Sequence, residues 1–208
     1  MPNTHVPELI PALPELFLAV IIMALLMFGV FQKGGRDEQD ITTFRYVTYM
    51  GIVGLLLAVL LTTLLAGERL VTFGGMFVSD GYAVFCKVLV LLASAGSLVI
   101  ARGFLERHSL ARFEFPVLVV FATLGMLMMI SANDMISLYL GLEMQSLSLY
   151  IIAAFQRDDT RSTEAGLKYF VLGAVASGML LYGMSLIYGF AGTTSFEAMA
   201  KMFTNTGP

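Results

Sequence analysis

Three ionisable side chains within or beside long apolar stretches of this 208-residue sequence could do chemistry: Glu143, Lys168 and Lys87. A charged group at membrane depth costs at least about 2.5–3.5 kcal/mol, and such groups usually mark an ion pathway or an ion pair. A carboxylate or an amine placed there can take up and release a proton. We therefore treat these three residues as the candidates for proton transfer.

Glu143 is the deepest of the three. It follows Asp134 by nine residues and precedes Arg157 by fourteen, which is about 13 Å and 21 Å along a helix. Its side chain cannot easily reach either surface. Hydroxyl groups share its helix face at spacings of three, four and seven residues: Tyr139, Ser146 and Tyr150. This pattern favours a proton relay, and the alternative is a neutral glutamate that only joins helices through hydrogen bonds.

The two lysines lie nearer to the ends of their apolar stretches. Lys168 follows Glu164 by four residues, so it is either a lysine that extends to the interface and pairs with that carboxylate, or a proton carrier. Lys87 follows Asp80 by seven residues, two helical turns. We expect its ammonium to extend toward Asp80, with a role in proton exit as the alternative.

Rise per residue places Glu143 about 20 Å and Lys168 about 6 Å from the loop that joins their two stretches. We therefore expect no carboxylate–ammonium contact under about 4 Å between them. We also expect the cation that faces Glu143 to come from outside these 208 residues.

The composition excludes several classes of protein. Apolar residues make up 58% of the chain and charged residues 13%, too few polar residues to cover a soluble enzyme. The net charge of -3, without a basic block, argues against nucleic acid as a partner. One cysteine, Cys86, cannot hold an iron–sulfur cluster. His5 and His108 lie outside the apolar stretches, so we expect no metal, haem or other cofactor in this chain.

Six apolar stretches are long enough to cross a bilayer, and they predict an all-α, polytopic fold with a single transmembrane domain over residues 1–208. Lysine and arginine gather in the three loops that follow the odd-numbered stretches. Because such loops stay in the cytoplasm, both ends of the chain are expected on the outer side. The segment from Thr193 to Pro208 reads as a connection to further residues. The predicted spans are about 14–31, 47–66, 82–101, 115–131, 135–155 and 165–190.

Two segments carry a resemblance to a known family. Residues 137–150 read SLYLGLEMQSLSLY, and residues 162–170 read STEAGLKYF. At this spacing they resemble the subunit N family, antiporter-like membrane subunits of the bacterial proton-pumping NADH:quinone oxidoreductase, respiratory complex I. The chain resembles only the N-terminal portion of that family.

The resemblance implies that Glu143 controls proton uptake and that Lys168 belongs to the same channel. It implies that NADH, flavin mononucleotide, iron–sulfur clusters and quinone are held by partner subunits. The partners would be other membrane subunits and lipid, in a bacterial inner membrane. Two rivals stay open: a subunit of a multi-subunit cation/proton antiporter, and a structural membrane subunit that conducts nothing. A transporter of organic solutes fits less well, because it usually has a polar cavity at the midplane.

Overall fold

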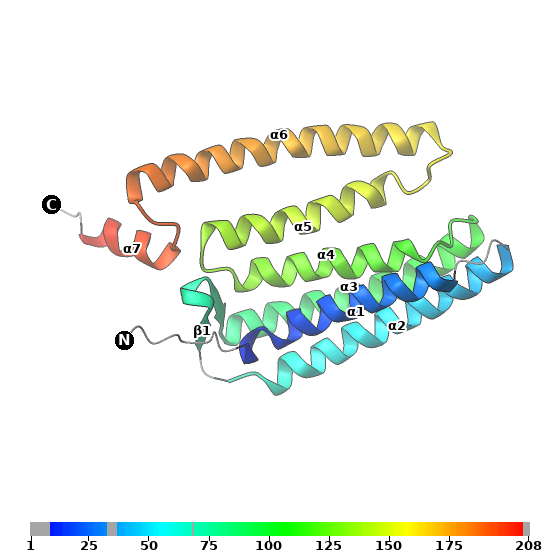
Figure 1. Cartoon of the computed structure of the whole chain (residues 1–208), viewed down its shortest axis with the longest axis horizontal. Helices are drawn as coiled ribbons and strands as arrows, with labels where there is room; N and C mark the ends of the chain where they lie inside the picture. Colours follow the sequence, from blue (N-terminus) through cyan, green and yellow to red (C-terminus); the bar gives the residue numbers. More distant parts are fainter. Residues whose placement is uncertain (1–8, 33–36, 68, 206–208) are drawn as a thin grey trace.

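The computed structural model describes residues 9–32, 37–67 and 69–205. Within them, six helices are long and apolar enough to cross a membrane, and they form an up-and-down bundle (Figure 1). A shorter helix, α7, follows. The helices are α1 (Leu13–Gln32, after a 3-10 turn at Ile10–Ala12), α2 (Asp37–Leu64), α3 (Gly81–Arg107), α4 (Glu114–Ser131), α5 (Met135–Ala153), α6 (Thr160–Ala191) and α7 (Phe196–Asn205).

The all-α membrane fold is therefore confirmed, but several helices extend beyond the predicted apolar spans. The second begins at Asp37, ten residues before the predicted start, and the third continues to Arg107. Hydropathy marks only the apolar middle of a helix, whereas polar turns continue the backbone hydrogen bonds at its ends. Three helices start at an aspartate that accepts a backbone N–H, as N-terminal caps do: Asp80, Asp134 and Asp159.

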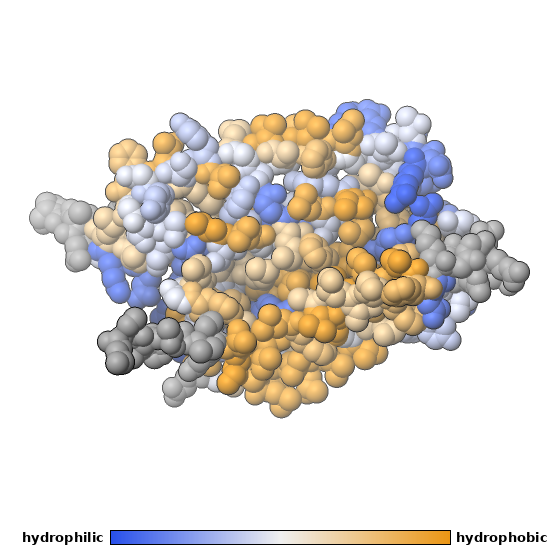
Figure 2. Space-filling view, in the orientation of Figure 1, coloured by the Kyte–Doolittle hydropathy of each residue, from blue (hydrophilic) through white to orange (hydrophobic). Residues whose placement is uncertain are grey.

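The first four helices enclose the hydrophobic core. Leu18 of α1, Leu55 of α2, Leu91 of α3 and Leu127 of α4 are completely buried in it. Hydrophobic residues dominate the middle of the face shown in Figure 2, and hydrophilic residues gather at the two ends. This arrangement suits a bundle that meets lipid along its sides and water at its ends.

Helices α4 and α5 pack unusually closely. A Cβ atom at Gly125 would lie 2.7 Å from the carbonyl oxygen of Gly141, and one at Gly141 would lie 2.9 Å from the carbonyl oxygen of Gly125. Only glycine leaves room for two backbones this near to each other. The crossing fixes α5, and with it Glu143, against the core.

A short β-hairpin, which the sequence pattern did not predict, covers the end of the bundle where α1, α3 and α5 begin (Figure 1). Strand β1 (Leu70–Thr72) pairs antiparallel with β2 (Phe77–Ser79). The α4–α5 turn is held to it, because the backbone N–H of Asn133 donates to the carbonyl oxygen of Met76 at 2.9 Å. The hairpin thereby joins α3 to α5.

The opposite end of the bundle carries the α3–α4 and α5–α6 links (Figure 1). There Glu106 accepts from Arg45 Nε at 2.9 Å and from Arg102 Nε at 3.0 Å, which ties α2 to α3. Lys33 and Arg36, which also entered the charge count, lie outside the described residues. That this basic end faces the cytoplasm stays a prediction from charge.

Candidate functional site

Glu143 lies midway along α5, on the side that meets α6. The Ser177 hydroxyl of α6 donates a hydrogen bond to Oε1 of Glu143. The Ser177 Oγ and the Tyr139 hydroxyl lie 2.8 Å apart. A carboxylate and two hydroxyls therefore form a continuous chain between the two helices.

Of the three hydroxyl residues predicted on the Glu143 face, Tyr139 is linked to Glu143, and only through Ser177. Among the described residues, neither Ser146 nor Tyr150 has a hydrogen bond to Glu143. The ring of Tyr150 packs edge-on against Tyr169, with 4.8 Å between ring centroids. A Cβ atom at Gly173 would overlap the Tyr150 hydroxyl. Shape, not hydrogen bonding, therefore places Tyr150 between α5 and α6.

Lys168 forms the predicted pair with the carboxylate one helical turn earlier. Its Nζ lies 2.5 Å from Oε1 of Glu164, and the two side chains are 69% and 58% exposed. Within the described part of the chain, no ion pair joins Lys168 to Glu143, as the difference in depth predicted. Ser177, which bonds Glu143, follows Lys168 by nine residues, about 14 Å along α6.

The expectation for Lys87 is wrong. Its side chain does not extend toward Asp80: it is only 1% exposed, and its Nζ lies 2.6 Å from Oε1 of Glu15. The ammonium also lies 4.9 Å from the ring centroid of Phe77. Asp80 is occupied elsewhere, because its carboxylate accepts the backbone N–H of Ala83 at 2.7 Å and caps α3.

Glu15 is the ionisable residue that the sequence analysis missed. Its side chain is 7% exposed, and its Oε2 accepts no hydrogen bond from the described residues. A signal was present in the sequence. Alternating helices put the starts of α1 and α3 at one end of the bundle, and Glu15 and Lys87 both lie near those starts. A buried lysine there needs a nearby carboxylate.

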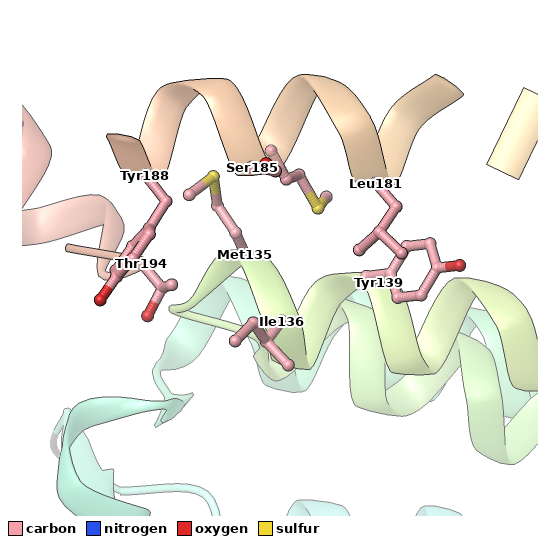
Figure 3. A pocket seen from close by; sticks show the side chains of 8 residues that line it. Met135, Ile136, Tyr139, Leu181, Ser185, Tyr188 and Thr194 are labelled. Carbon is pink, nitrogen blue, oxygen red and sulfur yellow. The ribbon is translucent and has the colours of Figure 1, made fainter. Parts of the chain in front are cut away.

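A cavity of about 490 Å³ lies between α5 and α6, beside the turn that leads to α7 (Figure 3). The ring of Tyr139 forms one end of it, and its hydroxyl points away from Tyr188 and Thr194, farther along α5 (Figure 3). The cavity walls are mainly apolar, with hydroxyl groups from Ser185, Tyr188 and Thr194. Of the three residues in the Glu143 network, Tyr139 alone lines this space, and it does so with its ring.

The α6–α7 turn closes this end of the site. Asp134 accepts hydrogen bonds from the Thr194 hydroxyl and from the backbone N–H of Ile136, the latter at 2.8 Å.

Outside the spans, on α7, Lys201 donates to Glu197 at 3.1 Å, and this hydrogen bond lowers the pKa of the Glu197 carboxyl. In the described residues, no group of three or more His, Cys, Asp or Glu is placed to hold a metal ion.

Comparison with known proteins gives one consistent family. The family described as "NADH:quinone oxidoreductase/Mrp antiporter, TM" matches residues 132–207. NADH-quinone oxidoreductase subunit N of Paramagnetospirillum magneticum is 58% identical over 196 residues, which are 94% of this chain and 39% of that relative.

Two solved structures share the fold. A chain of respiratory complex I from Thermus thermophilus matches with a TM-score of 0.72 and 30% identity, over 88% of this chain and 38% of that chain. A chain of the Mrp complex from Dietzia sp. matches with a TM-score of 0.64 at 21% identity, over 90% of this chain and 36% of that chain, which shows the fold alone.

The helices, the bacterial relatives and the matching family describe a multi-pass protein of a bacterial inner membrane. The chain spans about two fifths of the length of the curated relatives that it matches. Over these residues it belongs to the family of NADH-quinone oxidoreductase subunit N.

Proposed function

We propose that these residues are part of a proton-translocating membrane-arm subunit of an NADH:quinone oxidoreductase, with no redox chemistry of their own. The observation that carries the proposal is the placement of Glu143. Its carboxylate lies midway along a membrane-length helix and is bonded to a hydroxyl of the neighbouring helix. The names of the relatives at 58% and 55% identity support the same reading.

In this proposal Glu143 and Lys168 hold the transferred proton in turn. Lys168 is at the basic end of the bundle, where its exposed ammonium exchanges protons with water. Glu143 is about one-third of the full membrane thickness farther in, since about 14 Å separates Lys168 from Ser177, the partner of Glu143, and a bilayer with its interfaces is about 40–45 Å thick. Water, or a group on another part of the protein, has to carry the proton across that gap.

Lys87 enters the proposal only together with Glu15. The two charged atoms are 2.6 Å apart at the opposite end of the bundle, so a proton can pass from the ammonium to the carboxylate, leaving both groups neutral. This pair would serve proton exit at that end. The partners would be further membrane subunits of the complex, and NADH, flavin, iron–sulfur clusters and quinone would be bound elsewhere in it.

The test is a Glu143→Gln variant in the membranes of the source bacterium. Proton pumping, NADH:quinone reductase rate and the amount of assembled complex are measured together. We expect normal assembly with pumping and coupled turnover reduced together, because glutamine keeps the shape but holds no exchangeable acid proton. Glu197→Gln, an exposed carboxyl on α7, is the matched control and should leave all three unchanged.

Normal pumping by an assembled Glu143→Gln complex would instead favour the structural-subunit alternative. A cation/proton antiporter is the other rival, and the likeness to the Mrp complex supports only its fold. Sodium-dependent transport that persists without NADH would favour it.

A further inference from the structure

The direction of the two hydrogen bonds at Ser177 is fixed by its single hydroxyl proton. A serine hydroxyl has one O–H to donate and two lone pairs to accept. An ionised Glu143 only accepts, so the Ser177 proton points at Oε1 of Glu143. The Tyr139 hydroxyl must then be the donor in the 2.8 Å contact with Ser177.

Protonation of Glu143 reverses the chain. The carboxyl group then has a proton to donate to Ser177, and Ser177 can donate to Tyr139 in its turn. The same three atoms thus support two opposite hydrogen-bond directions, one for each charge state of Glu143. This is the arrangement that lets a proton move along hydroxyl groups without moving any heavy atom far.

The backbone of Tyr139 lies four residues before Glu143, about 6 Å toward the end of α5 that is capped by Asp134, whereas its hydroxyl points the other way along α5 (Figure 3). Lys168 lies on the other side of Glu143, toward the basic end. The ring of Tyr139 borders the cavity between α5 and α6, whose far wall is Thr194 (Figure 3).

We infer that Ser177 is a proton-transfer residue and that, with Tyr139, it forms a hydroxyl path that leads from Glu143. The inference rests on the proposed function. Protonated Glu143 gives its carboxyl proton to Ser177 as the Ser177 hydroxyl proton moves to the phenol oxygen of Tyr139. The phenol O–H proton moves to a water in the same step. The carboxylic acid becomes a carboxylate, the water becomes protonated, and both hydroxyls end as hydroxyls.

The experiment compares Ser177→Ala, Ser177→Thr and Tyr139→Phe in the full-length protein within its complex. A positioned proton-transfer group typically raises the rate of the step roughly 10²–10⁴-fold. A water molecule that replaces the lost hydroxyl recovers part of this rate. We expect Ser177→Ala to reduce pumping by about tenfold. Threonine keeps the hydroxyl and should restore more than half of the parental pumping. Tyr139→Phe keeps the ring and should give a smaller loss.

A second readout separates transfer from packing. Coupled turnover in D₂O and H₂O should show a larger isotope effect in Ser177→Ala and Tyr139→Phe than in the parent, because proton transfer becomes slower. Ser148→Ala is the matched control: this α5 hydroxyl donates to the carbonyl oxygen of Met144 within its own helix and should change neither readout.

If complexes with Ser177→Ala and with Tyr139→Phe both assemble and pump protons as fast as the parent, the inference is overturned. If Ser177→Ala does not assemble, the Tyr139→Phe result decides alone. Glu143→Gln is measured alongside. Loss of pumping in Glu143→Gln but not in the hydroxyl variants rejects only the relay, whereas normal pumping in all three rejects the proposed function as well.

Discussion

Lys87 and Glu15 form an ion pair in which both side chains are almost completely buried, with 2.6 Å between Nζ and Oε1. The pair joins α3 to α1 near the helix starts, directly under the hairpin whose Phe77 contacts the ammonium. A charge in this position is stable only while its partner is present. Helices α1 and α3 and the hairpin therefore depend on each other at this end.

Replacing Lys87 alone with methionine should be strongly destabilising. It leaves the Glu15 carboxylate buried and unpaired, which costs roughly 3–5 kcal/mol. We expect a lower midpoint in thermal unfolding of the detergent-solubilised complex and less assembled complex in membranes.

Replacing both partners tests the cause of that loss. Glu15→Leu together with Lys87→Met removes both charges and should recover most of the stability, since apolar pairs of similar volume are often as stable as buried ion pairs. Lys201→Met breaks an exposed pair and should change stability by less than about 1 kcal/mol. If the double variant is no more stable than the single one, the loss is due to packing.

A methyl group at the α4–α5 crossing should also be costly. Gly125→Ala places a Cβ 2.7 Å from backbone atoms of Gln145 and Gly141, which cannot move as a flexible side chain can. Overpacking of this kind costs typically about 1–3 kcal/mol. Gly96→Ala, on α3 with no atom within 4 Å of the added Cβ, is the control and should be neutral or slightly stabilising. The midpoints of thermal unfolding of the two variants are compared, and Gly125→Ala should have the lower one. Equal midpoints would contradict the close contact between α4 and α5.

The sequence was sufficient to predict the helical fold and the position of Glu143, for a physical reason. Long apolar stretches and a carboxylate far from both ends are local features, and rise per residue converts them into depth. The same arithmetic predicted the separation of Glu143 from Lys168. Ser177 was not among the predicted site residues. Its contact with Glu143 depends on how α6 is turned about its axis, and helix periodicity alone does not set that rotation.

The error at Lys87 has the same origin. Distance along the chain favoured Asp80, but that carboxylate is used in capping α3. Glu15 is 72 positions away in sequence and comes close only because α1 and α3 run in the same direction. The hairpin was missed because three-residue strands leave no periodic pattern to detect.

The orientation of the bundle can be measured with single cysteines in a Cys86→Ala background. Three basic loops at one end predict that this end is cytoplasmic. Asp158→Cys, in the exposed α5–α6 link, should react with a membrane-impermeant maleimide only after cells are permeabilised. Met76→Cys, half-exposed in the hairpin, should react in intact cells once the outer membrane is opened. The opposite labelling pattern would invert the proposed direction of every step between Lys168 and Tyr139.

At Lys168 an effect on proton transfer can be distinguished from an effect on stability, because its ion pair with Glu164 is exposed. A pair of this kind, one turn apart on a helix, is worth only about 0.2–0.5 kcal/mol. We therefore expect Lys168→Met to leave assembly and unfolding nearly unchanged while proton pumping falls. Glu164→Gln removes the same pair but keeps the amine, so it should retain more pumping than Lys168→Met. Equal pumping in the two variants and the parent would mean that Lys168 is a surface residue, and that protons reach Glu143 from this end by another route.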